Sequence, residues 1–165
     1  MALNSYARLK LQGTSLAGDT TQVTMGGVDV SSDYIELHEV CGGLGVAAST
    51  TTVRPGRPVL QPIALTKGID QSTPQLYRAL AANAVLDGDI LLFDTHPEDG
   101  STRHRFTLTL ANARVQSIAS CSPDTLDPTV SGRPAREVVT IAAPSLRLRD
   151  EVRSVEYQYD AVVQR

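Results

Sequence analysis

The sequence predicts a mainly β domain with one short helix, and three observations lead to this fold class. Apolar and polar residues alternate with a period of two in segments spread along the chain, which is the pattern of half-buried strands. Segments rich in Gly, Pro, Ser and Asp lie between them, as expected for turns. One stretch, residues 65–80, carries a helix start signal instead.

The alternating segments define the predicted strands. In chain order they are residues 7–11, 34–40, 106–110, 139–148 and 155–159. Glu39 interrupts the alternation of the second segment. After Leu110 the apolar phase shifts by one residue over 112–115, which predicts a bulge or bend.

Four segments rich in turn-forming residues are expected to connect the strands. They are residues 13–21, 42–57, 96–102 and 120–136. The last contains three prolines and one glycine, which predicts an irregular, exposed loop.

The helix of residues 73–83 has two alternative starts. Either Ser72 is the N-cap and Gln75 completes a capping box, or Thr73 is the cap and Pro74 occupies the first helical position. Both alternatives begin the helix within one residue of each other. They differ in the side chain that satisfies the first backbone N–H groups.

The predicted helix has one apolar face. Leu76 and Leu80 are one turn apart with Ala79 beside them, and Asn83 or Gly88 is expected to end the helix. A helix of about three turns is unstable alone in water. We therefore expect this face to dock on the β domain.

Length and composition bound the class of protein. The chain has 165 residues, 41% hydrophobic and 20% charged, with a net charge of −3, which predicts one domain over residues 1–165. The acidic excess disfavours nucleic-acid binding. The N-terminus lacks a signal-peptide pattern, and no apolar run reaches the roughly 20 residues that span a bilayer.

The sequence offers no catalytic motif and no recognisable set of metal ligands. In a regular strand His38 and Cys41 would point to opposite faces, and the acidic residues near His96 and His104 are typical of a solvated hairpin. The glycines after Cys41 match no nucleotide-binding motif. We expect no cofactor and no enzymatic activity. We also expect Cys41 and Cys121, which form no CxxC pair, to be reduced thiols.

The stretch "IALTKGIDQSTPQLYRAL" resembles the signature of Hcp, the haemolysin-coregulated tube protein of bacterial type VI secretion systems. The resemblance is carried by Thr66, Lys67, Asp70, Ser72, Pro74 and Leu76, with Leu65 where the family usually has Phe. The segments "DYIELHEV", "FTLTLANARVQSI" and "REVVTIAAPSLRL" resemble family strands in the same order. The late strand departs from the family, because residues 146–148 lack its aromatic side chains.

This resemblance implies a β-barrel of two sheets with one flanking helix, in a subunit of hexameric rings that stack into an expelled tube. The implied partners are copies of the chain, a contractile sheath, a VgrG-like spike and secreted effectors in the lumen. The subunit would be made in the bacterial cytoplasm and secreted without a signal peptide. Stable membrane anchoring is not expected.

The resemblance also suggests residues for assembly. The candidate inter-ring loop includes Gly42, Gly43, Leu44, Gly45, Val46 and Arg54. Cys41 is a candidate for the lumen wall, with a small buried residue as the alternative. Two other functions stay open: a tail-tube subunit of a phage-like injection particle, and a monomeric ligand-binding barrel.

Overall fold

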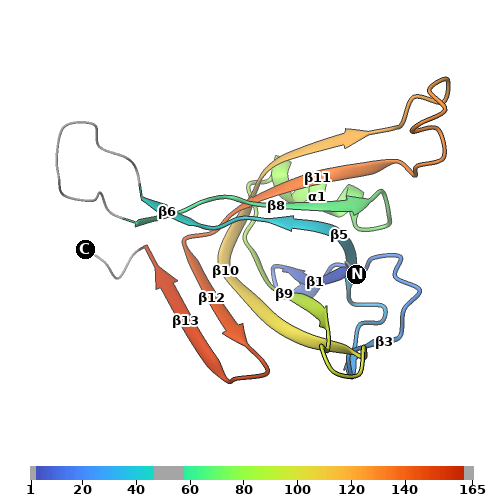
Figure 1. The fold of residues 1–165 in the computed structure, drawn as a ribbon. Coiled ribbons are helices and arrows are strands. Elements are labelled where there is room, and N and C mark those ends of the chain that lie inside the picture. Colours follow the sequence, from blue (N-terminus) through green and yellow to red (C-terminus); the bar gives the residue numbers. More distant parts are fainter. Residues whose placement is uncertain (1–2, 47–57, 162–165) are drawn as a thin grey trace, which may run out of the picture.

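The computed structural model describes residues 3–46 and 58–161 (Figure 1). Nearly all regular structure in these residues is β. The strands are β1 (Ser5–Leu11), β2 (Thr14–Ser15), β3 (Thr24–Met25), β4 (Val28–Asp29), β5 (Ile35–Cys41), β6 (Leu44–Val46), β7 (Pro58–Leu60), β8 (Ile63–Gly68), β9 (Leu86–Thr95), β10 (Thr102–Cys121), β11 (Arg136–Ala142), β12 (Ser145–Asp150) and β13 (Val155–Asp160). The helix α1 covers Thr73–Ala81. The mainly β fold class is confirmed.

Six strands close into a barrel. Their order is β11-β8-β5-β1-β9-β10, and β10 also pairs with β11, which completes the circuit. The hairpin of β12 and β13 continues the same sheet from β10, while β3–β4 and β6–β7 form two small separate sheets. All strand pairs in the described part of the chain are antiparallel.

Strand β10 closes the barrel because it bends along its length (Figure 1). Its first half pairs with β9 and β12, and its second half pairs with β11. The pairing with β9 shifts between Leu110 and Ala113, where Asn112 has a φ of 54°. The bend that the sequence predicted at residues 112–115 is confirmed.

A second irregularity explains the break in alternation at Glu39. The register of β5 against β8 shifts between Leu37 and Glu39, as in a β-bulge. Ile35 and Leu37 are buried before the shift, and Val40 packs against the same core after it. The bulge therefore keeps the apolar residues on both sides of it facing inward.

Two turn-rich segments differ in outcome. Residues 122–135 connect β10 to β11 without a strand, so the predicted irregular loop is confirmed. The expected loop at 42–57 instead begins as a strand, because β6 pairs with β7. We call β6 and β7 the ribbon. The backbone N–H and C=O groups of the two strands of the ribbon hydrogen-bond to each other. The many small residues of this segment gave no sign of this pairing.

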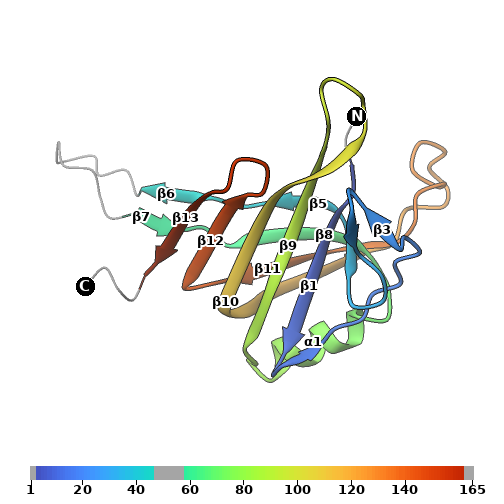
Figure 2. The same ribbon diagram turned by 90° about the horizontal axis from the view of Figure 1, so that it is seen from below.

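The helix lies across one end of the barrel (Figure 2). Leu76 and Ala79 are buried in the main core cluster, which confirms the predicted docking face. Asn83, with a φ of 48°, follows the helix end, as expected for a left-handed terminating residue. Within the described residues, no helix is long and apolar enough to cross a membrane.

The start of the helix corrects the capping-box hypothesis. Ser72 occupies the N-cap position but makes no side-chain capping hydrogen bond. Its hydroxyl donates to Asp70 Oδ1 at 2.6 Å instead, so Ser72 is bonded to the preceding loop. Pro74 lies in the first turn, where its missing N–H is not needed.

Replacing Leu76 with Asp tests whether helix docking stabilises the fold. The side chain is 1% exposed, so a carboxylate there would be buried without a partner, and we expect a loss of roughly 3 kcal/mol or more. Chemical denaturation measures this loss. Gln75→Asp introduces the same charge on the exposed side of the same turn, so it should leave stability unchanged. Equal stability of the two variants would contradict the docking role.

Candidate assembly surfaces

Two residues of the resemblance, Lys67 and Asp70, belong to a buried cluster around the ammonium group of Lys67. Lys67 is 1% exposed and Glu137 is fully buried. The Nζ atom lies 2.8 Å from Glu137 Oε1 and 2.8 Å from Asp70 Oδ1. It also donates to the carbonyl of Gly68 at 2.8 Å. A buried charge is tolerated only when it is paired and hydrogen-bonded, and Lys67 meets both conditions.

Hydroxyl groups complete this cluster. Thr73 Oγ1 donates to Glu137 Oε1 at 2.9 Å and accepts from Lys67 Nζ at 3.2 Å. The backbone N–H of Ser72 donates to Asp70 Oδ1 at 2.9 Å. The cluster thus joins the end of β8, the first turn of α1 and the start of β11. Sequence reasoning missed Thr73 and Glu137 as members of this cluster.

Thr66 belongs to a different contact. Its hydroxyl donates to Glu39 Oε2 at 3.3 Å, across the β5–β8 pairing. The carboxylate of Glu39 also accepts a 3.5 Å hydrogen bond from the thiol of Cys41. Glu39 raises the pKa of Cys41 above the ordinary thiol value. The hydrogen bond is the larger cause, and the negative charge of Glu39 is the second.

Cys41 is exposed at the end of β5, so it is not a small core residue of the subunit. Its position on the lumen wall stays a prediction. The second thiol, Cys121, is also exposed. Cys41 pairs with Ala64 near the start of β8. Cys121 pairs with Arg136, which in turn pairs with Gly68 at the end of β8. Four residues of β8 span about 13 Å, too far for a disulfide within one subunit.

The ribbon contains three of the six candidate inter-ring residues. Leu44, Gly45 and Val46 form β6, and Gly42 and Gly43 lead into it from β5. A Cβ atom on Gly42 would lie 2.8 Å from a side-chain carbon of Ile63, so this position requires glycine for close packing. Arg54 lies outside the described residues.

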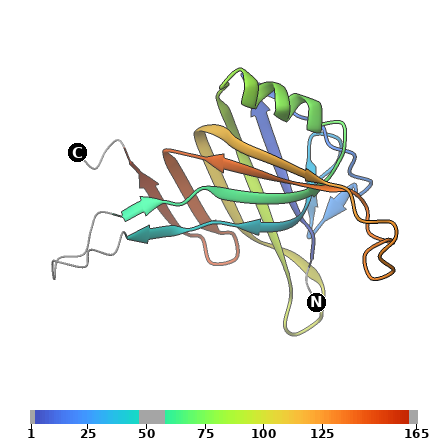
Figure 3. The same cartoon turned by 90° about the horizontal axis from the view of Figure 1, so that it is seen from above.

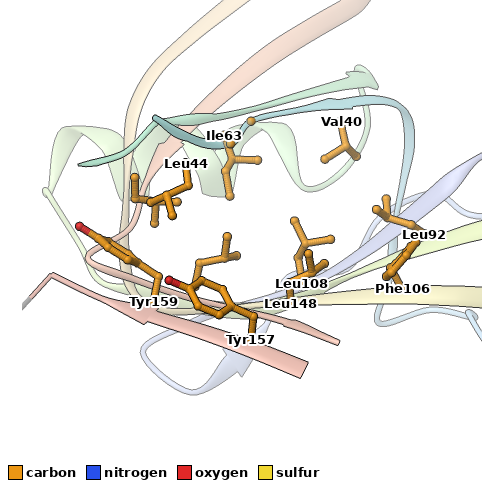
Figure 4. A pocket seen from close by; sticks show the side chains of 13 residues that line it. Val40, Leu44, Ile63, Leu92, Phe106, Leu108, Leu148, Tyr157 and Tyr159 are labelled. Atoms are coloured by element: carbon orange, nitrogen blue, oxygen red, sulfur yellow. The ribbon is translucent and has the colours of Figure 1, made fainter. Parts of the chain in front are cut away.

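An apolar groove of about 420 Å³ opens between the ribbon and the β12–β13 hairpin (Figure 4). One wall is formed by β10, β12 and β13, through Phe106, Leu108, Leu146, Leu148, Tyr157 and Tyr159. The opposite wall is formed by the adjacent ends of β5, β6, β7 and β8, through Val40, Leu44, Leu60 and Ile63. At one end, the Tyr159 hydroxyl donates to the carbonyl of Pro58 at 2.7 Å.

The groove exists because the sheet divides after β11. Strand β11 stays in the barrel beside β8, whereas β12 continues along β10 and pairs with β13. The inner face of β12, with Leu146 and Leu148, is therefore not covered by β8. Alternation in the sequence showed which residues share a face, but it could not show this separation.

The described residues contain no group of three or more His, Cys, Asp and Glu side chains that could hold a metal ion. The buried charges of the Lys67 cluster all have partners within the cluster. Its arrangement positions three elements of the fold. The groove and the ribbon are the surfaces whose chemistry suits contact with another molecule.

Lys67→Met tests the buried cluster. Removal of the ammonium leaves Glu137 buried without a counter-charge, which we expect to cost about 3–5 kcal/mol of unfolding free energy. Lys10→Met is the matched control, because Lys10 is exposed on β1. Adding Glu137→Gln to Lys67→Met should recover part of the loss. A Lys67→Met protein as stable as the control would refute this account.

Glu39→Gln tests the environment of Cys41. Because Glu39 raises the pKa of the thiol, its neutralisation should lower that pKa and increase the thiolate fraction at pH 8. Alkylation of Cys41 should then be faster, measured as rate against pH in a Cys121→Ser background. Alkylation of Cys121 in a Cys41→Ser background should not respond to Glu39→Gln. Identical pH profiles for Cys41 with and without Glu39 would disprove the effect.

Comparison with known proteins agrees with this fold. Residues 9–163 match the family described as "Type VI secretion system effector, Hcp". No curated protein matches the sequence. Many solved structures do, among them one described as "Crystal structure of Hcp protein", 21% identical over 95% of this chain and 96% of that one, with a TM-score of 0.81.

Two further structures come from named bacteria. A mutant of Hcp1 from E. coli EAEC 042 is 19% identical over 97% of this chain and 99% of its own, with a TM-score of 0.80. Hcp3 from Pseudomonas aeruginosa is 18% identical over 96% and 98%, with a TM-score of 0.68. These likenesses establish the shared fold, and the family match spans nearly the whole chain: the chain belongs to the Hcp family, the tube proteins of the type VI secretion system.

Proposed function

We propose that this chain forms hexameric rings through head-to-tail contacts and that the rings stack into the expelled inner tube. The observation that carries the proposal, beside family membership over residues 9–163, is that exposed apolar side chains gather at two unlike ends of the subunit. Unlike surfaces on opposite ends favour heterologous contacts, which close into rings or continue as filaments. A stacked tube requires both.

The first of these surfaces is the groove end, which consists of the groove and the ribbon. Its exposed apolar side chains include Leu44, Val46, Val59 and Tyr157. These side chains border the groove or belong to the ribbon beside it. Separately placed apolar residues are ordinary on a protein surface, but a set around an apolar groove indicates an interaction site.

The second surface is the loop end, which consists of the 122–135 loop and its neighbours on α1 and after β8. Its exposed apolar residues are Ile69, Tyr77 and Leu126. The backbone N–H of Ile69 donates to the carbonyl of Ala135 at 3.4 Å. The Tyr77 hydroxyl is 2.8 Å from Ser120 Oγ. The loop and the ribbon extend from opposite ends of the molecule (Figure 3).

In this assembly the ribbon reaches the neighbouring ring, and Cys41 faces the lumen. Effectors occupy the lumen, the contractile sheath surrounds the tube, and a VgrG-like spike caps it. The subunit is made in the bacterial cytoplasm and leaves without a signal peptide. Its role is mechanical, with no cofactor and no catalysed reaction.

A specific observation also favours a second candidate, a monomeric ligand-binding barrel. The groove has the size of small-molecule sites, which are about 300–1,000 Å³ and mostly apolar. Such a protein would bind its ligand as a single chain. The two candidates therefore differ in the oligomeric state that they predict in the absence of ligand.

Light scattering with negative-stain imaging tests the proposal. We expect particles with the mass of six 17.6 kDa chains and the outline of rings at micromolar concentration. Val46→Asp, at the exposed ribbon, should reduce stacking of rings while leaving single rings intact. A monomer at every concentration up to the millimolar range would overturn the ring proposal and favour the ligand-binding candidate.

A further inference from the structure

We infer that Leu126 of one subunit inserts into the apolar groove of the next subunit within a ring. This inference rests on the proposed function, because it names the contact that closes the ring. It joins the loop end of one copy to the groove end of another. The argument depends on how Leu126 is held, on the chemistry of the groove and on the distance between them in one chain.

Leu126 projects from a loop whose backbone is fixed by its own side chains. Leu126 is 90% exposed, and its N–H donates to Asp124 Oδ1 at 2.9 Å. One residue later, Asp127 Oδ1 accepts from both the N–H and the hydroxyl of Thr129, at 2.8 and 2.7 Å. These hydrogen bonds stabilise the conformation of the loop in which Leu126 is exposed to solvent. They hold the side chain outward.

The groove can accept such a side chain. Its volume of about 420 Å³ is well above the roughly 150 Å³ of an apolar cavity that holds benzene, so a Leu side chain and its backbone fit. The lining side chains are aliphatic or aromatic, and their polar atoms are the hydroxyls of Tyr157 and Tyr159, of which the Tyr159 hydroxyl donates to the carbonyl of Pro58. An apolar occupant leaves the hydrogen bond of the Tyr159 hydroxyl intact.

Leu126 cannot fill the groove of its own subunit. Ile63 lines the groove, whereas Gly68, at the other end of β8, pairs with Arg136 at the base of the 122–135 loop. Five residues of strand separate the two sites by about 17 Å, and the loop extends away from the ribbon, which borders the groove (Figure 3). The occupant must therefore come from a second copy. This geometry repeats from copy to copy, as a ring requires.

Burial of one Leu in an apolar site tightens association by roughly tenfold to a hundredfold, which is large for a single side chain. We therefore assign this contact to the ring. The more exposed ribbon is left for the weaker contacts between rings.

Disulfide trapping tests the contact directly. In a chain with Cys41→Ser and Cys121→Ser, Leu126→Cys and Leu148→Cys are introduced together, and rings are first verified by light scattering. Dissolved oxygen with a copper catalyst then takes two electrons and two protons from each thiol pair. Because the two positions cannot meet within one chain, we expect a ladder of covalent oligomers up to the hexamer on a non-reducing gel. Each single-cysteine variant can give dimers at most.

Rings that form but give no species beyond the dimer would overturn the inference and leave the ring proposal intact. If the double variant stays monomeric while the unmodified protein forms rings, Leu126 or Leu148 is needed for association. The cross-linking is then repeated at higher protein concentration. Absence of the ladder there also overturns the contact. If the unmodified protein forms no rings, both proposals fail.

Leu126→Ser gives a second measurement without cross-linking. Because Leu126 is exposed in the subunit, the variant should keep the thermal stability of the monomer. It should raise the concentration at which rings dissociate by about tenfold or more. Val23→Ser is the matched control, since Val23 is 65% exposed and belongs to neither end. Equal dissociation of the two variants would contradict the inference.

Discussion

The ion pairs of Lys67 hold the fold together at one point, and much of the remaining structure is arranged around them. One ammonium contacts a carboxylate from the loop before α1 and a carboxylate from β11. The helix can therefore begin only where Asp70 and Thr73 meet the end of β8. Strand β11 is aligned beside β8 with Glu137 directly opposite Lys67. Such a contact contributes less to net stability than to selecting one arrangement, because loss of either partner leaves a buried charge.

The barrel and the groove are two consequences of the bend in β10. A strand of twenty residues is too long to follow one side of a small barrel without curving. The irregularity around Asn112 directs its second half toward β11, which closes the barrel. Its first half, still paired with β12, extends beyond the closed part. Closure of the barrel and exposure of the face of β12 therefore share one cause.

The sequence predicted strands well where one face is buried and the other is exposed. It did not identify β9, whose central residues Ile90 to Phe93 are continuously apolar. The structure shows why: Ile90 belongs to the barrel core, whereas Leu91 packs with Tyr6 and Val30 in a second cluster under the β3–β4 hairpin. A strand covered on both faces has no alternation to detect.

The sites were predictable to different degrees. Lys67 and Asp70 were singled out because both belong to the short stretch that resembles the family signature. Glu137 is seventy residues from Lys67, and no local pattern reports a contact across that distance. The groove depends on where two hairpins separate, which is a property of the whole sheet. The ribbon was mistaken for a loop because its strands are only three residues long and β6 follows two glycines.

The closed circuit of paired strands also determines how the subunit responds to mechanical load. Each barrel strand has a neighbour on both sides, so its removal requires many hydrogen bonds to break together. Strand β13 pairs with β12 along one side and leads directly to the C-terminal residues. Force applied at that end would break its hydrogen bonds one after another, as in opening a zipper. We expect the hairpin to peel away at low force while the barrel, loaded in shear, stays folded.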